Sequence, residues 1–197
     1  MADEALALLE LDAVASGLRA LDALVKRAPV RVLEANLVEP GRFLVLFCGG
    51  VAEVEEARAA GVEAAGPALL HQLLLPLAHP SLLAGLRGAL KVGSEAELDC
   101  LGVIEGAAIA PTLAALDRAL KDAEVHLCGL RVHGGLGGRA YAVVHGAQHD
   151  VEAALEVAEA ALRAAGALHR LERIPRPHPE LLPFLLRRPP FSVGSEV

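Results

Sequence analysis

Apolar residues follow two different periods in the first part of this chain, and the two periods predict short strands and helices. Residues 5–10 form an apolar run that predicts a strand. Across residues 14–25 the apolar side chains recur at helical spacing, and two cations follow near the expected C-terminal end, where positive charge is favoured. The pattern therefore predicts a strand and then a helix, which Pro29 helps to close.

Further elements follow in a regular order. Residues 30–37 and 43–48 predict two strands that are joined by a turn containing a Pro-Gly pair. A second helix, a fourth strand and a short last helix that begins at a proline are expected at residues 51–65, 69–75 and 80–90. The predicted order is strand, helix, strand, strand, helix, strand, helix.

The whole pattern occurs twice along the chain. Residues 5–30 align without gaps with residues 100–125, and identical pairs include Leu18/Leu113, Asp22/Asp117 and Lys26/Lys121. Further on, the five-residue loop 38–42 corresponds to the longer loop 133–139, as expected because loops absorb insertions. A last match pairs the segment PLAHP at 76–80 with PRPHP at 175–179. An internal duplication of this extent sets the architecture of the protein.

The duplication predicts two α+β domains that pack against each other. We expect the first domain at residues 1–92, a polar linker at 92–97, the second domain at 98–187 and a flexible tail at 188–197.

Composition narrows the classes of function. The chain has 197 residues, 54% of them hydrophobic and 3% aromatic, so its core is built mainly from Ala, Leu and Val. The formal charge of −7 argues against a nucleic-acid partner, because phosphate binding needs a basic face. Polar residues interrupt the apolar stretches before they reach the roughly 18 residues of a membrane span. The N-terminus lacks a basic region before an apolar one, so we expect a cytoplasmic protein without a membrane partner.

Candidate chemistry is sparse. The three cysteines are far apart and form no CxxC pair, which argues against a metal site defined by spacing. The glycines at 135–140 resemble a relaxed dinucleotide fingerprint, but a strand rather than a helix follows them. His145 and His149 are four residues apart, yet a glycine and the end of a strand separate them. Without a nucleophile paired with a base, we do not expect an enzyme.

The repeated motifs resemble the bacterial microcompartment (BMC) shell domain. In that domain the first strand ends in Glu, as at Glu10, and the first helix carries the Asp-Ala-x-x-Lys pattern found at residues 22–26. The segment IPRPHPEL at 174–181 is similar to the domain's C-terminal signature. The resemblance covers about residues 5–187, with the strands in unpermuted order. Within the family, the chain is similar to the tandem, trimeric BMC-T class of propanediol-utilization microcompartments. It implies an α+β fold, with two copies of a ferredoxin-like sandwich of antiparallel sheet and helices.

The resemblance also implies an assembly. Proteins of this class form homotrimers in which six shell domains make a pseudohexameric tile. The tiles pack with other hexameric, trimeric and pentameric shell proteins into a microcompartment shell around encapsulated enzymes in the cytoplasm. A central pore for metabolites, cofactors or ions is expected, and stacked trimers remain an open alternative.

Two groups of site residues follow from the resemblance. Tile-edge contacts are expected from Lys26, Lys121 and Arg176, and the residue of the first copy that corresponds to Arg176 is Leu77. The loops between the second and third strands are expected to line the pore, with the residues Val38, Glu39, Pro40, Gly41, His133, Gly134, Gly135, Leu136 and Gly137. We assign the glycines first to backbone geometry, since turns use them for positive φ.

Glu39 is the informative departure from the family pattern. Propanediol-type relatives resemble this chain but have a cysteine there, which binds an iron–sulfur cluster on the axis. Because carboxylates do not replace thiolates in such clusters, we expect no iron–sulfur cofactor. Three Glu39 side chains would make a cation-favouring ring, with Arg42 and Arg139 as candidate counter-charges. The simpler alternatives are a solvated Glu39 that points away from the axis and, for the whole chain, a small-ligand-binding regulatory α+β protein.

Overall fold

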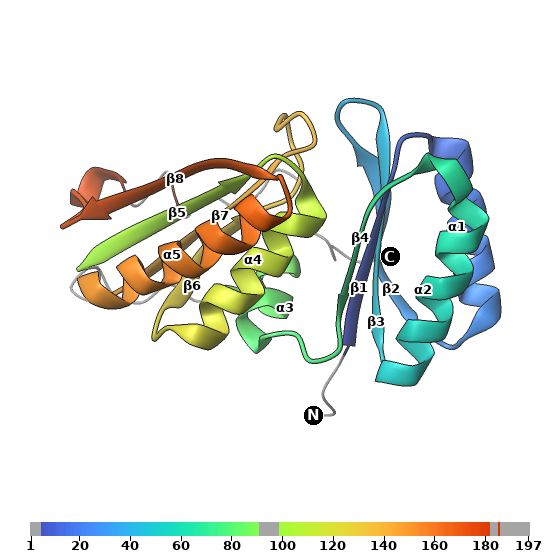
Figure 1. The fold of residues 1–197 in the computed structure, drawn as a ribbon, viewed down its shortest axis with the longest axis horizontal. Coiled ribbons are helices and arrows are strands. Elements are labelled where there is room, and N and C mark those ends of the chain that lie inside the picture. Colours follow the sequence, from blue (N-terminus) through green and yellow to red (C-terminus); the bar gives the residue numbers. More distant parts are fainter. Residues whose placement is uncertain (1–4, 91–98, 182–184, 186–197) are drawn as a thin grey trace. The chain divides into compact units, whose positions relative to one another are not determined.

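The computed structural model describes residues 5–90, 99–181 and 185. The chain forms two compact units, Met1–Ala78 and His79–Val197. Each unit contains one four-stranded antiparallel sheet with helices on one face (Figure 1). The predicted linker, 92–97, and the predicted tail, 188–197, lie outside the described residues.

The first unit has the order of elements that the hydrophobic pattern predicts. In the first sheet the strands lie in the order β2-β3-β1-β4, and every neighbouring pair is antiparallel. The elements are β1 (Ala5–Leu11), α1 (Val14–Arg27), β2 (Arg31–Val38), β3 (Arg42–Gly49), α2 (Val51–Ala65), a short 3-10 turn (Gly66–Ala68) and β4 (Leu69–Leu75).

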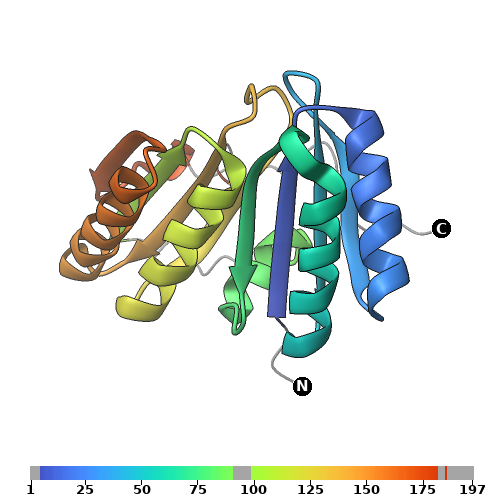
Figure 2. The ribbon, with the colours of Figure 1, turned by 45° about the vertical axis from the view of Figure 1, so that its right-hand side comes forward.

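The core of the first unit lies between the sheet and its two helices. Figure 2 shows α1 and α2 side by side on one face of the sheet, where Leu9, Leu24 and Phe47 are fully buried. A Cβ atom on Gly17 would lie only 2.3 Å from the ring of Phe43, so this glycine lets α1 approach the sheet closely. The helix position over the sheet therefore depends on a residue without a side chain.

The second unit repeats the topology. Its strands lie in the order β6-β7-β5-β8, again antiparallel throughout. The elements are α3 (Pro80–Leu86), β5 (Cys100–Gly106), α4 (Ile109–Asp122), β6 (His126–Arg131), β7 (Ala140–Gly146), α5 (Gln148–Ala164), β8 (Leu168–Pro175) and a 3-10 turn (Pro179–Leu181). The residues after the glycines at 135–138 thus form strand β7, as the sequence predicts.

Helix α3 differs from its sequence-based prediction in length and surroundings. It ends at Leu86 rather than at residue 90, because Gly88 takes a φ of +66° and its N–H bonds the carbonyl of Gly85. The sequence pattern assigns α3 to the first copy, but the helix packs within the second unit, against β6 and α4. In the described part of the chain, two helices therefore cover the first sheet and three cover the second.

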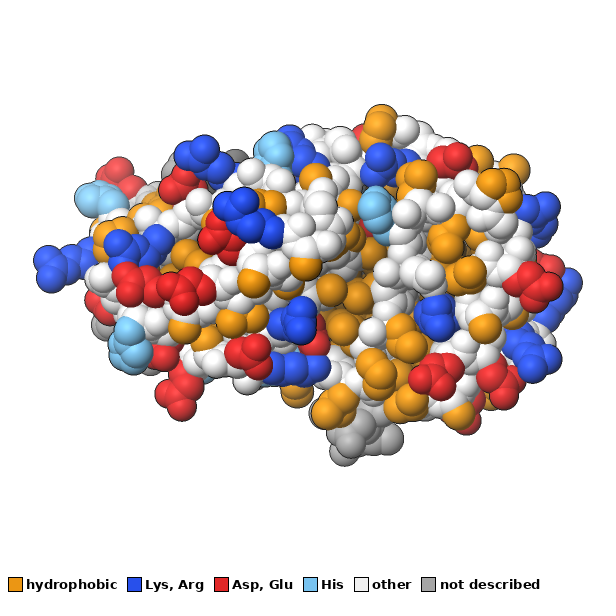
Figure 3. Space-filling view, viewed as in Figure 1, with side chains coloured by type: hydrophobic (Ala, Val, Ile, Leu, Met, Phe, Trp, Pro, Cys, Tyr) orange, Lys and Arg blue, Asp and Glu red, His pale blue; other side chains and the backbone are white. Residues whose placement is uncertain are grey.

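No helix in the described ranges combines the length and the apolar character that a bilayer span requires. The face visible in Figure 3 carries acidic and basic side chains in an interspersed arrangement rather than in separate areas.

Candidate functional site

The loop of the first repeat is a tight hairpin turn between β2 and β3. Val38 pairs with Arg42 and is only 4% exposed, so its side chain is buried in the unit rather than presented at the tip of the turn. Glu39, Pro40 and Gly41 are exposed at the tip, and Gly41 has a φ of +76°. Of the four residues predicted to line a pore in this loop, three present surface to solvent in the single chain.

The corresponding loop of the second repeat is longer and rich in glycine. Gly134, Gly135, Gly137 and Gly138 all have φ between 62° and 92°, a region that strains residues with a Cβ atom. This confirms the geometric interpretation of these glycines. Their backbone N–H and C=O groups, rather than side chains, are what this part of the loop can offer to a solute.

Arg139 holds the base of the longer loop. Its Nη1 donates to Glu105 Oε1 at 2.8 Å and lies 2.6 Å from His169 Nε2, while its Nε donates to the carbonyl of Leu136 at 3.2 Å. Within its own unit Arg139 forms an ion pair with Glu105, and its predicted role as a counter-charge for Glu39 concerns the assembled pore. The arginine therefore ties the loop to the end of β5.

The first repeat places a related set of side chains at the same end of its sheet. Glu10 is fully buried at the end of β1 and is paired in register with His71 of β4. Burial, and then the positive charge of Arg42, lowers the pKa of His71. The sequence pattern predicts no contact between Glu10 and His71, and it offers Arg42 only as a counter-charge for Glu39. The available signal was a glutamate that ends an apolar strand in both copies, at Glu10 and at Glu105.

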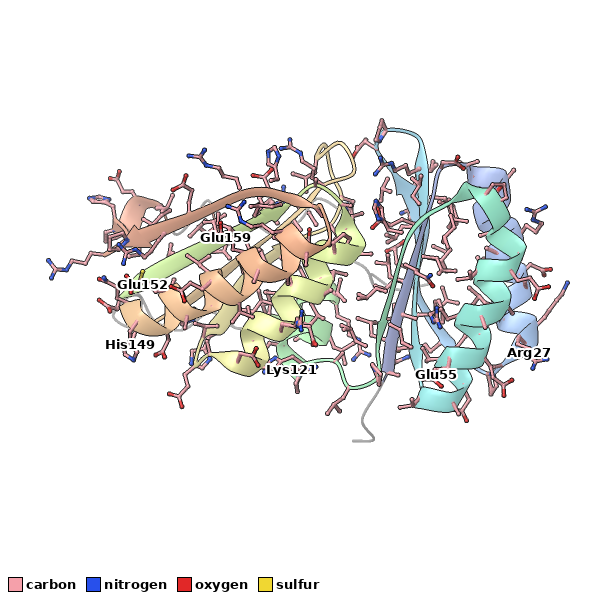
Figure 4. The ribbon with its side chains drawn as sticks, in the orientation of Figure 1. Arg27, Glu55, Lys121, His149, Glu152 and Glu159 are labelled. Atoms are coloured by element: carbon pink, nitrogen blue, oxygen red, sulfur yellow. The ribbon has the colours of Figure 1, made fainter. Side chains whose placement is uncertain are left out.

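The two predicted edge lysines make the same local contact in different environments. Lys26 donates to Asp22 at 2.6 Å, and both side chains are more than half exposed. Lys121 donates to Asp117 at 2.5 Å, but there the aspartate side chain is only 4% exposed (Figure 4 labels Lys121 on α4). One lysine thus stands on the surface with its partner, while the other is anchored to a buried carboxylate.

The second oxygen of Asp117 explains this difference. The backbone N–H of His79 donates to Asp117 Oδ1 at 2.7 Å, so the carboxylate joins α4 to the segment that leads into α3. Loss of water lowers the pKa of His79, an effect that the nearby Asp117 opposes. This contact connects residues 38 positions apart, and no local pattern in the sequence indicates it.

The third predicted edge residue, Arg176, follows β8. Its backbone has a φ of +47°, and its N–H donates to the carbonyl of Asp99 at 2.8 Å. This hydrogen bond fixes the backbone at Arg176, while the side chain is exposed. The matching residue of the first repeat, Leu77, is 54% exposed. The two repeats therefore present a cation and an apolar side chain at equivalent surface positions.

The cysteines are poor candidates for ligands. Cys48, Cys100 and Cys128 are all buried, and burial raises the pKa of the Cys128 thiol to about 12. Metal ligation requires the thiolate form. Within the described residues, no three His, Cys, Asp or Glu side chains gather in an arrangement that could hold a metal ion.

Comparison with known proteins gives consistent results. The model of the BMC domain matches the chain twice, at residues 5–77 and 100–177. The bacterial microcompartment shell protein PduT of Citrobacter freundii is 36% identical over 175 residues, which are 89% of this chain and 94% of that protein. A crystal structure of a microcompartment protein from Desulfitobacterium hafniense has a TM-score of 0.82 and 34% identity, over 91% of this chain and 98% of that one. A fused permuted hexameric shell protein of the RMM microcompartment shares the fold alone, with a TM-score of 0.60 and 21% identity over 83% of each chain.

Proposed function

This chain belongs to the BMC domain family, and we propose that it is a structural shell protein of a bacterial microcompartment that forms a trimeric tile with a central pore. The observation that carries the proposal is the presence of two BMC domains in tandem, together with shell proteins as relatives over nearly the full chain. The role is structural rather than enzymatic, and the place of the protein is the microcompartment shell.

The duplication supports the trimer. Both units have the same strand order and place their variable loop between equivalent strands, so three chains would supply six similar domains. Closed rotational symmetry is the usual form of homo-oligomers, and it would bring three copies of each loop to one axis. The trimer would then be pseudohexameric, with two alternating kinds of domain.

The two loops would line the pore in unequal ways. The first loop would contribute the Glu39 carboxylate at its exposed tip, and a ring of three carboxylates favours cations. The second loop would contribute His133 and backbone groups of its glycines, which suit contact with polar solutes. Val38 would stabilise the turn rather than contact solutes, because its side chain is buried.

An iron–sulfur cluster is not part of this proposal. By the resemblance to propanediol-type shell proteins, Glu39 takes the position of the cluster-binding cysteine, and the cysteines of this chain are buried in the two units. A carboxylate ring instead suits a hydrated cation or a pore that discriminates by charge.

Tile edges would be formed by Lys26, Lys121 and Arg176. All three side chains reach the surface, and their different anchoring would make the two kinds of edge unequal. We propose that these edges contact other hexameric, trimeric and pentameric shell proteins, and that the assembled shell surrounds encapsulated enzymes.

Light scattering on a sizing column tests the trimer, because three chains of 20.4 kDa give a native mass of about 61 kDa. Electron microscopy of the same fractions tests the packing of tiles into flat layers. Lys26→Ala should abolish the layers and leave the trimer intact. The matched control is Arg163→Ala, which removes another exposed cation from the last turn of a helix and should leave the layers unchanged. A stable monomer would refute the tile, and layers that persist in Lys26→Ala would refute the edge assignment.

The pore needs its own test. Trimers reconstituted in a planar bilayer, or assembled shells in a permeability assay, should pass cations in preference to anions. Glu39→Gln should reduce that preference. Unchanged selectivity in Glu39→Gln would mean that Glu39 points away from the axis.

A further inference from the structure

Equivalent residues of the two repeats differ sharply in exposure along one helix face. Leu18 of α1 is 53% exposed, whereas Leu113, the identical residue of α4, is fully buried. Val25 is 45% exposed, whereas its counterpart Leu120 is 4% exposed. Because these pairs have the same positions on their helices, the difference lies in what covers the helix and not in the sequence of the helix itself. We call the face of α1 that includes Leu18, Asp22 and Val25 the α1 outer face.

The second unit shows part of what covers this face in α4. The segment from His79 into α3 crosses it, and the N–H of His79 bonds the buried Asp117. Beside it, Gly85 packs so tightly that a Cβ atom there would lie 3.0 Å from Leu127 of β6. His79 and Pro80, where this covering segment begins, are the last two residues of the PLAHP segment of the first repeat. The last residues of one repeat therefore contact the first helix of the next repeat.

The matching segment at the end of the second repeat has the same local form. In both segments the ring Nδ1 of the histidine accepts a hydrogen bond from the N–H two residues later, at 3.2 Å for His79 and 3.3 Å for His178. In both, the carbonyl of the histidine accepts from the N–H three residues later, at 2.9 Å. His178, Pro179 and Glu180 are exposed, whereas Leu181 packs against the cluster of Leu101, Cys128 and Val143 in its own unit. The second segment therefore has the local form of the first and presents His178 at the surface.

We propose that residues 177–180 of one chain dock on the α1 outer face of a second copy, with the N–H of His178 donating to Asp22 Oδ1. This inference rests on the proposed trimer and specifies how its chains are joined. Within the described residues Asp22 bonds Lys26 alone, through Oδ2, as Asp117 bonds Lys121 through Oδ2. The remaining oxygen of Asp22 then receives the N–H that Asp117 receives from His79.

The contact is head-to-tail. Each chain offers one docking segment after β8 and one α1 outer face, so the same contact repeats from chain to chain until a ring closes. Docking also removes Leu18 and Val25 from water, which matches the burial of their counterparts in α4. The contact of His79 with Asp117 inside each chain and the contact of His178 with Asp22 between chains would then be equivalent interfaces.

Two substitutions at one position separate the backbone donor from the side chain. His178→Pro removes the N–H, and the φ of −61° at the equivalent His79 is one that proline adopts. His178→Ala keeps the N–H and removes the imidazole. Since a hydrogen bond to a charged group contributes about ten- to hundredfold in binding, His178→Pro should weaken each chain-to-chain interface by about that factor. His178→Ala should retain the trimer.

Asp22→Ala is a second variant on the opposite side of the interface, and because Asp22 is exposed it should leave the fold of the single chain intact. Native mass is measured by light scattering over a dilution series, with circular dichroism as a control for folding. Dissociation of both His178→Pro and Asp22→Ala, with His178→Ala still trimeric, is the expected result. If the wild type is a trimer and both variants remain trimeric at every dilution, this inference is overturned while the tile stands. A monomeric wild type would instead overturn the tile.

Discussion

The two Asp-Lys pairs allow a direct test of how burial changes the energy of the same contact. Lys121→Met and Lys26→Met each remove the ammonium group and keep the apolar length of the side chain. Asp117 is nearly inaccessible to water and would retain the N–H of His79 as its partner, whereas Asp22 is well exposed and would be solvated. We therefore expect Lys121→Met to be the more destabilising of the two.

The size of the effect follows from the exposure of each partner. Breaking a fully buried ion pair costs about 3–5 kcal/mol. Lys121 is 37% exposed, so water screens part of the interaction, and about 1.5–3 kcal/mol is the expected loss for Lys121→Met. An exposed pair at this helical spacing contributes at most about 0.5 kcal/mol, which is the expected limit for Lys26→Met.

Urea unfolding followed by circular dichroism measures both losses, with wild type and variants compared at the same protein concentration. With a slope of about 2 kcal/mol per molar urea, Lys121→Met should lower the midpoint by about 1 M and Lys26→Met by less than about 0.3 M. Equal midpoints for the two variants would refute the argument that burial of Asp117 makes its contact with Lys121 structural.

Three further predictions concern other parts of the fold. Leu113→Ala should lower the free energy of unfolding by about 2–5 kcal/mol, whereas Leu18→Ala in the dissociated chain should lower it by less than about 1 kcal/mol. Equal losses in urea titrations would contradict the difference in burial. Because burial lowers the pKa of His71, the unfolded chain binds the proton more readily, and stability should fall as pH drops below about 6.5. His71→Gln should therefore reduce the loss of Tm between about pH 7.5 and 5.5. An unchanged loss of Tm would mean that other groups cause the pH dependence. Gly17→Ala should lower Tm by the equivalent of about 1–3 kcal/mol despite the better helix propensity of alanine, since its Cβ meets Phe43, and a higher Tm would show that the ring can move aside.

Much of the fold follows from local pattern. The strands and helices of the first repeat begin and end within a few residues of the predicted bounds, because side-chain periodicity and prolines act over single elements. The main difference, the early end of α3, arises at Gly88, whose positive φ terminates the helix. The BMC domain and its duplication were also readable from the sequence, and the family match confirms both.

The candidate site was less accessible to sequence reasoning. The loop residues could be located, but the attachment of the longer loop through Arg139 to Glu105 joins residues 34 positions apart. A charged residue near a loop has many candidate partners along the chain, and the choice among them depends on which strands become neighbours. The roles of the loops in a pore and of the lysines at tile edges remain predictions that the experiments above address.

The elements, their order, the two repeats and the family can all be read from the sequence, since each depends on short-range spacing or on recurrence along the chain. Which of two identical residues is buried depends on the tertiary structure. Leu18 and Leu113, or Asp22 and Asp117, have the same local pattern, yet one member of each pair is exposed and the other is not. Burial depends on what the rest of the chain brings to a helix, and the segment that leads into α3 reaches α4 through a contact between residues distant in sequence.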